Sequence, residues 1–132
     1  MMKNKDINKV SKILEEVGKM VRKDPEENTL QLRKGIKEIE VILQNSKNRH
    51  LIFLSYFLGF FIEDVWSNIA MDSSFKINDE DIKDILYSIG GVFINISKHL
   101  KQEMYYECYD NYVNLLYNYL NLIESIKEKI SE

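Results

Sequence analysis

The sequence predicts an all-α fold, a single up-and-down helical bundle of four to five helices around a central apolar helix. Two observations carry this prediction. Apolar residues recur at spacings of three and four along most of the 132 residues, which is the period of amphipathic helices. The stretch 51–71, LIFLSYFLGFFIEDVWSNIAM, is apolar on nearly every side, so it requires neighbours on at least three sides.

Length and composition favour one globular domain, residues 1–132. A chain of this length can bury a core without disulfides, and its single cysteine, Cys108, has no partner within the chain. One cysteine is typical of proteins from a reducing compartment, and the N-terminus has no apolar run that resembles a signal peptide. We therefore expect a cytoplasmic protein.

A membrane span is the alternative for the central stretch. Its uninterrupted apolar part covers only 51–62, which is shorter than the roughly 20 residues that a bilayer requires. Glu63 and Asp64 follow directly, and each is unfavourable in lipid. The sequence thus favours a buried helix and no membrane partner.

Two amphipathic helices precede the central one. The first covers about 6–23, with a stripe formed by Ile7, Val10, Leu14, Val17 and Val21. Asp24 and Pro25 then read as the N-cap and first residue of a second helix. Its stripe is Leu32, Ile36, Ile39 and Leu43, while Leu30 and Val41 lie on the opposite side and hint at a second contact surface.

Two more helices follow a loop at 72–77, from which Phe75 and Ile77 are expected to reach the core edge. Asn78 is a good N-cap for the fourth helix, in which Gly90 and Gly91 predict close packing or a bend. Its stripe is Ile82, Ile85, Leu86, Ile89, Phe93, Ile96 and Leu100. The fifth helix covers about 102–130, with a stripe of Tyr105, Tyr109, Tyr112, Leu116, Tyr119, Ile123, Ile126 and Ile130. The sequence gives only a weak signal for a turn between the fourth and fifth helices, so one long helix is an alternative.

Two polar residues fall on the apolar side of the central helix. Asp64 lies between Phe53 and Phe57 on a helical wheel, and Asn68 follows one turn later. A buried carboxylate must be paired, hydrogen-bonded or shifted in pKa. Asp64 and Asn68 are therefore buried polar candidates: either part of a polar network with a tyrosine hydroxyl or a lysine, or a polar spot in a ligand-binding or catalytic groove. An exposed helix flank is the remaining interpretation of Asp64.

Motifs for metal, cofactor or nucleophilic chemistry are missing from the sequence. His50 and His99 lack the spacing of metal ligands, and no glycine-rich phosphate loop or dinucleotide fingerprint occurs. Cys108 has no activating neighbour in the sequence and is expected to be a small core residue. We expect neither a metal nor a cofactor, and the sequence favours a protein that is not an enzyme.

Six tyrosines fall between residues 105 and 119. Four belong to the predicted stripe, but Tyr106 and Tyr117 lie together at its margin, on either side of Asp110. Tyrosine is favoured where a surface is both apolar and wet, so Tyr106, Tyr117 and Asp110 are our candidates for a protein interface. The alternative is that this margin packs against the first helix.

The charge distribution leaves a second class of function open. The net charge is −3, but Lys and Arg concentrate in the first 50 residues and Asp and Glu in the remainder. The simplest interpretation is that the two halves complement each other; a nucleic-acid surface would use Lys12, Lys19, Arg22, Lys23, Arg33, Lys34 and Lys37.

We expect a small cytosolic adaptor, inhibitor or regulatory subunit that acts through a protein partner or self-association. The alternatives are a nucleic-acid-associated subunit, and a ligand-binding or catalytic bundle built around Asp64.

Overall fold

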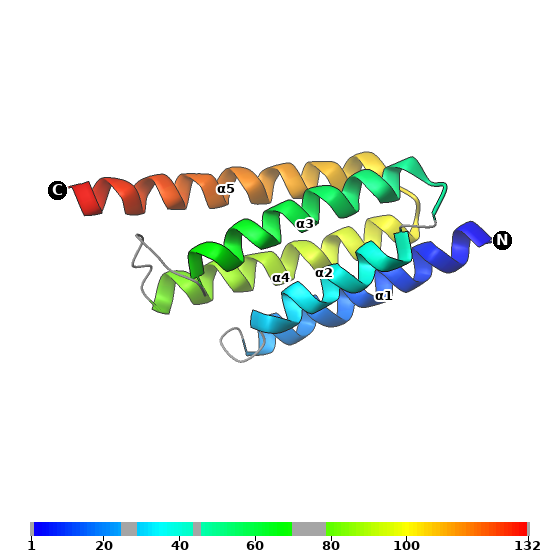
Figure 1. The fold of residues 1–132 in the computed structure, drawn as a ribbon, viewed down its shortest axis with the longest axis horizontal. Coiled ribbons are helices and arrows are strands. Elements are labelled where there is room, and N and C mark those ends of the chain that lie inside the picture. Colours follow the sequence, from blue (N-terminus) through cyan, green and yellow to red (C-terminus); the bar gives the residue numbers. More distant parts are fainter. Residues whose placement is uncertain (1, 25–28, 44–45, 70–78, 132) are drawn as a thin grey trace.

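Five α-helices make up the protein (Figure 1). The computed structural model describes residues 2–24, 29–43, 46–69 and 79–131. The helices are α1 (Met2–Lys23), α2 (Thr29–Leu43), α3 (Arg49–Ile69), α4 (Asp79–Lys101) and α5 (Tyr105–Ser131), and the described residues contain no strand. The all-α prediction is therefore confirmed, and the packing is compatible with a bundle. Successive helices run in opposite directions, as Figure 1 shows.

One apolar cluster receives side chains from all five helices. The described members of the stripes predicted for α1, α2 and α4 are buried without exception, because the 3.6-residue period places each stripe on one side of its helix and that side faces the core. In α4 the row from Leu86 to Leu100 is completely inaccessible to solvent. The helix α4 packs against α1 and α5, while α2 packs against α1 and α3.

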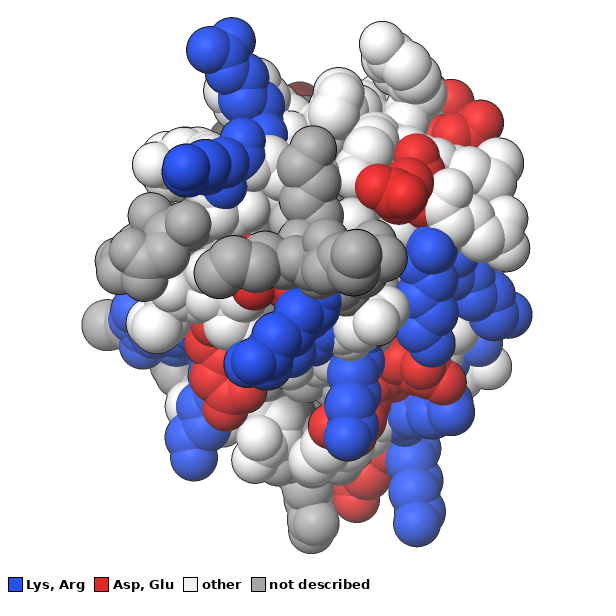
Figure 2. Space-filling model, turned by 90° about the vertical axis from the view of Figure 1, so that its right-hand side faces the viewer, with Lys and Arg blue, Asp and Glu red and all other residues white. Residues whose placement is uncertain are grey.

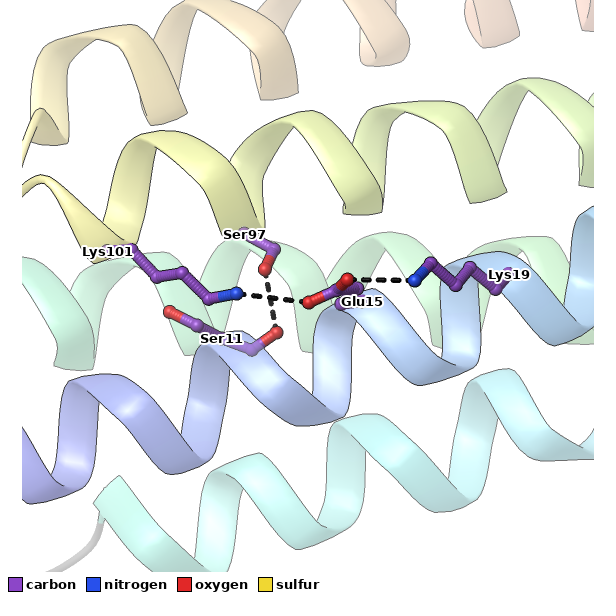
Figure 3. Close-up of polar contacts among 5 residues, drawn as sticks. All are labelled: Ser11, Glu15, Lys19, Ser97 and Lys101. Carbon is purple, nitrogen blue, oxygen red and sulfur yellow. Dashed lines mark hydrogen bonds and ion pairs between the residues drawn. The ribbon is translucent and has the colours of Figure 1, made fainter.

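The closest helix pair is α1 with α4. A Cβ atom built on Gly18 would lie 2.6 Å from the carbonyl oxygen of Gly90, and one built on Gly90 would lie 2.7 Å from the carbonyl oxygen of Gly18. Two turns away, the Ser97 hydroxyl donates a hydrogen bond of 2.8 Å to the carbonyl oxygen of Ser11 (Figure 3). Small residues seven positions apart on each helix thus bring the two backbones together, and the close packing predicted for Gly90 is confirmed.

Polar contacts flank the close contact between α1 and α4. Glu15 of α1 accepts hydrogen bonds from Lys19, one turn along the same helix, at 2.9 Å and from Lys101 of α4 at 3.0 Å (Figure 3). Arg22 lies over the Tyr87 ring, 4.0 Å from its centroid, and donates to the Tyr87 carbonyl oxygen. These basic side chains of α1 are therefore engaged within the bundle.

A tight turn separates α4 from α5. The amide of Met104 donates to the carbonyl of His99, and the amide of Glu103 donates to the carbonyl of Leu100, which together form a Schellman motif. Glu103 occupies the left-handed position of this motif, with φ of 55°. Glycine is the usual residue there, so its absence explains why the sequence signalled the turn weakly. The alternative of one long helix is wrong.

Two expectations about the core need correction. The central helix, α3, is not enclosed on three sides: Phe53 is 52% exposed and Phe60 is 75% exposed. In α5, Cys108 and Leu115 are buried, whereas Leu116 is only partly buried, so the core side is rotated slightly from the predicted stripe. The predictions for Pro25, Phe75, Ile77 and Asn78 concern residues outside those that the structure describes.

Candidate protein interface

The outward side of α3 carries a row of exposed aromatic residues. The buried side of the helix is formed by Leu51, Leu54, Leu58, Phe61, Ile62 and Val65, which face the core. Phe53 and Phe60 lie seven residues apart on the other side, with Tyr56 and Phe57 between them, and all four are exposed. Because α3 is apolar around most of its circumference, packing one side into the core necessarily leaves aromatic rings in solvent.

A second exposed row runs along α5. Tyr106 is 75% exposed, Tyr117 is 66% exposed, and Val113 and Leu120 fill the positions between and beyond them. Asp110 is exposed on the same side. The spacing from 106 to 110, 113, 117 and 120 alternates between four and three residues, so these side chains form one stripe along the helix. The predicted interface residues therefore lie together, within a row that the sequence analysis identified only in part.

Ring contacts join α3 to α5 between these two rows. Phe57 stacks on Tyr112, with 5.5 Å between ring centroids, and Phe61 packs edge to face with Tyr112 at 6.1 Å and with Tyr119 at 5.2 Å. The exposed Tyr106 ring packs edge to face with His50 of α3 at 6.2 Å. The two rows consequently border one seam, and we call the surface the aromatic face, formed by Phe53, Tyr56, Phe57, Phe60, Tyr106, Val113, Tyr117 and Leu120.

Hydrogen bonds fix one end of this seam. The Asn48 side-chain amide donates to the Tyr105 hydroxyl at 2.9 Å, and His50 Nδ1 lies 3.0 Å from the Tyr109 hydroxyl oxygen. His50 also stacks on the Tyr105 ring, with centroids 4.5 Å apart. Sequence analysis considered His50 only as a possible metal ligand and gave it no role. Its partners are more than 50 residues away, so no local signal could have identified them.

The tyrosines along the seam are held in the neutral form. Desolvation by burial raises the pKa of Tyr109 and of Tyr112 above the ordinary value of 10.0. The pKa of Tyr105 is raised for the same principal reason, although its hydrogen bond from Asn48 acts in the opposite direction. The protonated hydroxyls of Tyr105 and Tyr109 donate hydrogen bonds to the Glu103 carboxylate and to the His50 carbonyl oxygen.

Asp64 lies at the rim of the seam. Its side chain is exposed, contrary to the expectation of burial, and its Oδ2 accepts a hydrogen bond of 3.0 Å from the Tyr119 hydroxyl. This arrangement matches the interpretation of a polar contact with a tyrosine on an exposed flank. The side chain of Asn68, the second buried polar candidate, lies outside those that the structure describes.

Asp64 lines neither of two concave regions on the described surface. A shallow cavity of about 120 Å³ between α4 and α5 is lined by Asp84, Ile85, Ser88, Leu115, Asn118, Tyr119 and Leu122. A more open depression beside α2 is lined by Lys34, Lys37, Glu38, Val41 and Ile42. Tyr119, which lines the first cavity, is the residue that connects it to Asp64 through its hydroxyl.

The other predicted residues show no arrangement for chemistry. Cys108 is completely buried; desolvation, and to a lesser extent Glu107, raises the pKa of its thiol to about 12, so the reactive thiolate is scarce at neutral pH. Among the described residues, no group of three or more His, Cys, Asp or Glu could hold a metal ion. His99 lies near Asn111, with 3.3 Å between Nδ1 and the amide nitrogen.

Basic residues of the N-terminal half are distributed among acidic ones. Arg33 of α2 pairs with Glu63 of α3, with 3.1 Å between Nε and Oε1, and Lys19 pairs with Glu15. Figure 2 views the end of the bundle that carries the N-terminus, and there Lys and Arg side chains are interspersed with Asp and Glu. This distribution agrees with charge complementarity between the halves.

None of the described helices combines the length and the apolarity that a bilayer span requires. No protein-family model matches the chain, and neither the curated proteins nor the solved structures include a detectable relative.

Proposed function

We propose that this protein is a cytosolic adaptor, inhibitor or regulatory subunit that binds another protein through the aromatic face and catalyses no reaction. The observation that supports it is the concentration of exposed apolar side chains on one side of the molecule. Single exposed apolar residues are ordinary on protein surfaces, but a continuous group of them marks a contact site. Eight such side chains lie on the outward sides of α3 and α5.

The composition of the face supports a protein partner. Interface centres are enriched in aromatic residues, which contribute large areas with few rotatable bonds. Covering one exposed phenylalanine or leucine contributes about 1.5–3 kcal/mol. A partner that covers only Phe60, Tyr106 and Tyr117 would therefore gain enough free energy to offset part of the entropy lost on association.

A matched pair of valine substitutions tests the proposal. Val113 on α5 is 57% exposed within the face, and Val41 on α2 is 64% exposed outside it. We expect Val113→Ser to reduce capture of a partner from a lysate of the native host by about threefold or more, because roughly 1 kcal/mol of apolar burial is lost. Val41→Ser should leave capture unchanged, as measured by quantitative mass spectrometry.

A double substitution addresses the predicted interface directly. Tyr106→Ala with Tyr117→Ala should abolish capture, or the dimer if the partner is a second copy, while the helical circular dichroism signal stays at its wild-type value. Light scattering fixes the number of subunits in each sample. Unchanged mass together with unchanged capture would overturn the proposal.

A further inference from the structure

The charged residues beside the aromatic face are predominantly acidic. On α5, Asp110 lies within the exposed row and Glu124 continues it by one turn after Leu120. On α3, Glu63 and Asp64 follow Phe60. Arg49, at the start of α3, is the one exposed cation on the α3 part of this border, and it lies at the opposite end of the helix from Glu63 and Asp64.

These carboxylates differ in the contacts that the protein makes with their negative charge. Glu63 is paired with Arg33 of α2. Asp64 accepts a hydrogen bond from Tyr119, which orients the carboxylate. Among the described side chains, no cation lies within ion-pair distance of Asp110 or Glu124. The part of the border beside Asp110 and Glu124 therefore keeps a negative potential.

This negative potential favours some kinds of binding partner over others. Phosphate groups of nucleic acids or anionic lipids would be repelled by it, although the aromatic rings alone could stack on bases. A second copy of the chain would bring a face of the same sign. A partner with basic residues around an apolar centre is complementary in both respects.

The shape of the face favours a helix. α3 and α5 run in the same direction along the seam (Figure 1), and they are the most sparsely packed pair of neighbouring helices. The row from Tyr106 to Leu120 spans about 21 Å at 1.5 Å per residue, which equals the length of a four-turn helix. A helix laid along such a seam presents side chains at i, i+3, i+4 and i+7 to the rings on both sides.

We propose that the aromatic face takes a basic amphipathic helix of a partner protein. This helix is about four turns long, with bulky apolar residues along one side and Lys or Arg beside them, next to Asp110 and Glu124. The inference rests on the proposed function, since it names the chemistry of the partner at that same surface.

An unbiased peptide selection tests this inference. A library of randomised 18-residue peptides displayed on phage is selected on the wild-type protein and depleted on the Phe60→Ser, Tyr117→Ser double variant, whose fold is verified by circular dichroism. We expect the enriched peptides to carry apolar residues at helical spacing and a net positive charge. Acidic, neutral or proline-rich extended peptides, or no enrichment at all, would overturn the inference.

Charge reversal then tests the role of the two carboxylates. For a synthetic basic peptide from the selection, Asp110→Lys with Glu124→Lys should weaken binding about tenfold, and added salt should reduce the difference. The matched control is Glu16→Lys with Glu38→Lys, which makes the same change in net charge on exposed positions of α1 and α2 and should leave binding unchanged. Equal effects of the two double variants would overturn a local role for Asp110 and Glu124.

The outcomes separate this inference from the proposed function. If peptides of any charge bind and Val113→Ser weakens them, the face is an interface but its partner is not a basic helix. If no peptide binds and light scattering shows a dimer that Tyr106→Ala with Tyr117→Ala dissociates, the occupant is a second copy. If neither occurs and capture from the lysate is also unaffected, both proposals fail.

Discussion

At the scale of single residues, the Glu15 carboxylate shows how the fold concentrates charge. Its two oxygens accept hydrogen bonds from the ammonium groups of Lys19 and Lys101. These bonds, the Lys19 bond first, lower the pKa of Glu15 from 4.5 to about 2. The Lys19 contact spans four residues on one helix and could be anticipated from sequence, whereas Lys101 comes from α4 and could not.

This arrangement makes the stability depend on pH. Glu15 is more acidic in the folded protein than in the unfolded chain, so it stabilises the fold above pH 4.5 and loses this effect as the pH falls towards 2. We expect the free energy of unfolding, from urea titrations at pH 5 and pH 2.5, to fall less in Glu15→Gln than in the wild type. Glu16→Gln, one residue along and exposed, should behave as the wild type does.

High salt provides an independent check at the same residue. The three side chains are partly exposed, so added salt should reduce the difference between wild type and Glu15→Gln. Identical loss of stability in both proteins between pH 5 and pH 2.5, at low salt, would contradict the assignment.

At the scale of elements, two adjacent glycines of α4, Gly90 and Gly91, have different surroundings. A Cβ atom on Gly90 would meet the backbone oxygen of Gly18 at 2.7 Å, and this atom cannot move without separating the helices. A Cβ atom on Gly91 would meet the guanidinium of Arg22 at 2.6 Å, which is the end of a flexible side chain. The same substitution at these neighbouring positions should therefore have opposite effects.

We expect Gly90→Ala to lower the free energy of unfolding by about 1–2 kcal/mol, because forced separation of the helices exceeds the gain in helix propensity of about 1 kcal/mol. Gly91→Ala should be neutral or stabilising by up to about 1 kcal/mol, since Arg22 can turn aside. Thermal and urea unfolding of the two variants measure the difference. Equal stability would show that the close contact at Gly90 has no energetic role.

The elements also show which part of the fold sequence could predict. Where a helix has one apolar side, as α1 and α4 do, the period fixes the buried residues, and the structure agrees with them. In α3 apolar residues surround most of the helix, so the period does not show how wide the buried side is, and the exposure of Phe53 and Phe60 was missed. In α5, tyrosine suits both core and surface, which shifted the predicted stripe relative to Cys108 and Leu115.

The candidate interface was predictable to a similar extent. Tyr106, Asp110 and Tyr117 were identified from their spacing on one helix, and Val113 and Leu120 fit the same alternation of three and four residues. The contribution of α3 depends on which of its sides meets α5, which is a tertiary property set by contacts such as Phe57 with Tyr112. Sequence alone therefore identified part of the α5 row of the face and did not identify the α3 row.

At the scale of the whole molecule, Cys108 reports whether the five helices unfold together. It lies on α5, is completely inaccessible to solvent, and its thiol donates to the carbonyl oxygen of Ile96 on α4 at 3.6 Å. A reagent reaches it only after α5 separates from α4, and the high pKa of the thiol further slows reaction in the folded protein. The rate of labelling thus measures the opening of the bundle.

We expect the opening that exposes Cys108 to be the global unfolding of the chain, because one apolar cluster contains side chains from all five helices. The logarithm of the labelling rate should then rise with urea concentration in proportion to the equilibrium m value, measured by circular dichroism under the same conditions. A much shallower slope would show that α5 detaches as a separate unit. In that case the seam with α3, and with it the aromatic face, would exist only in part of the population, and a partner helix would have to stabilise α5 before it could bind.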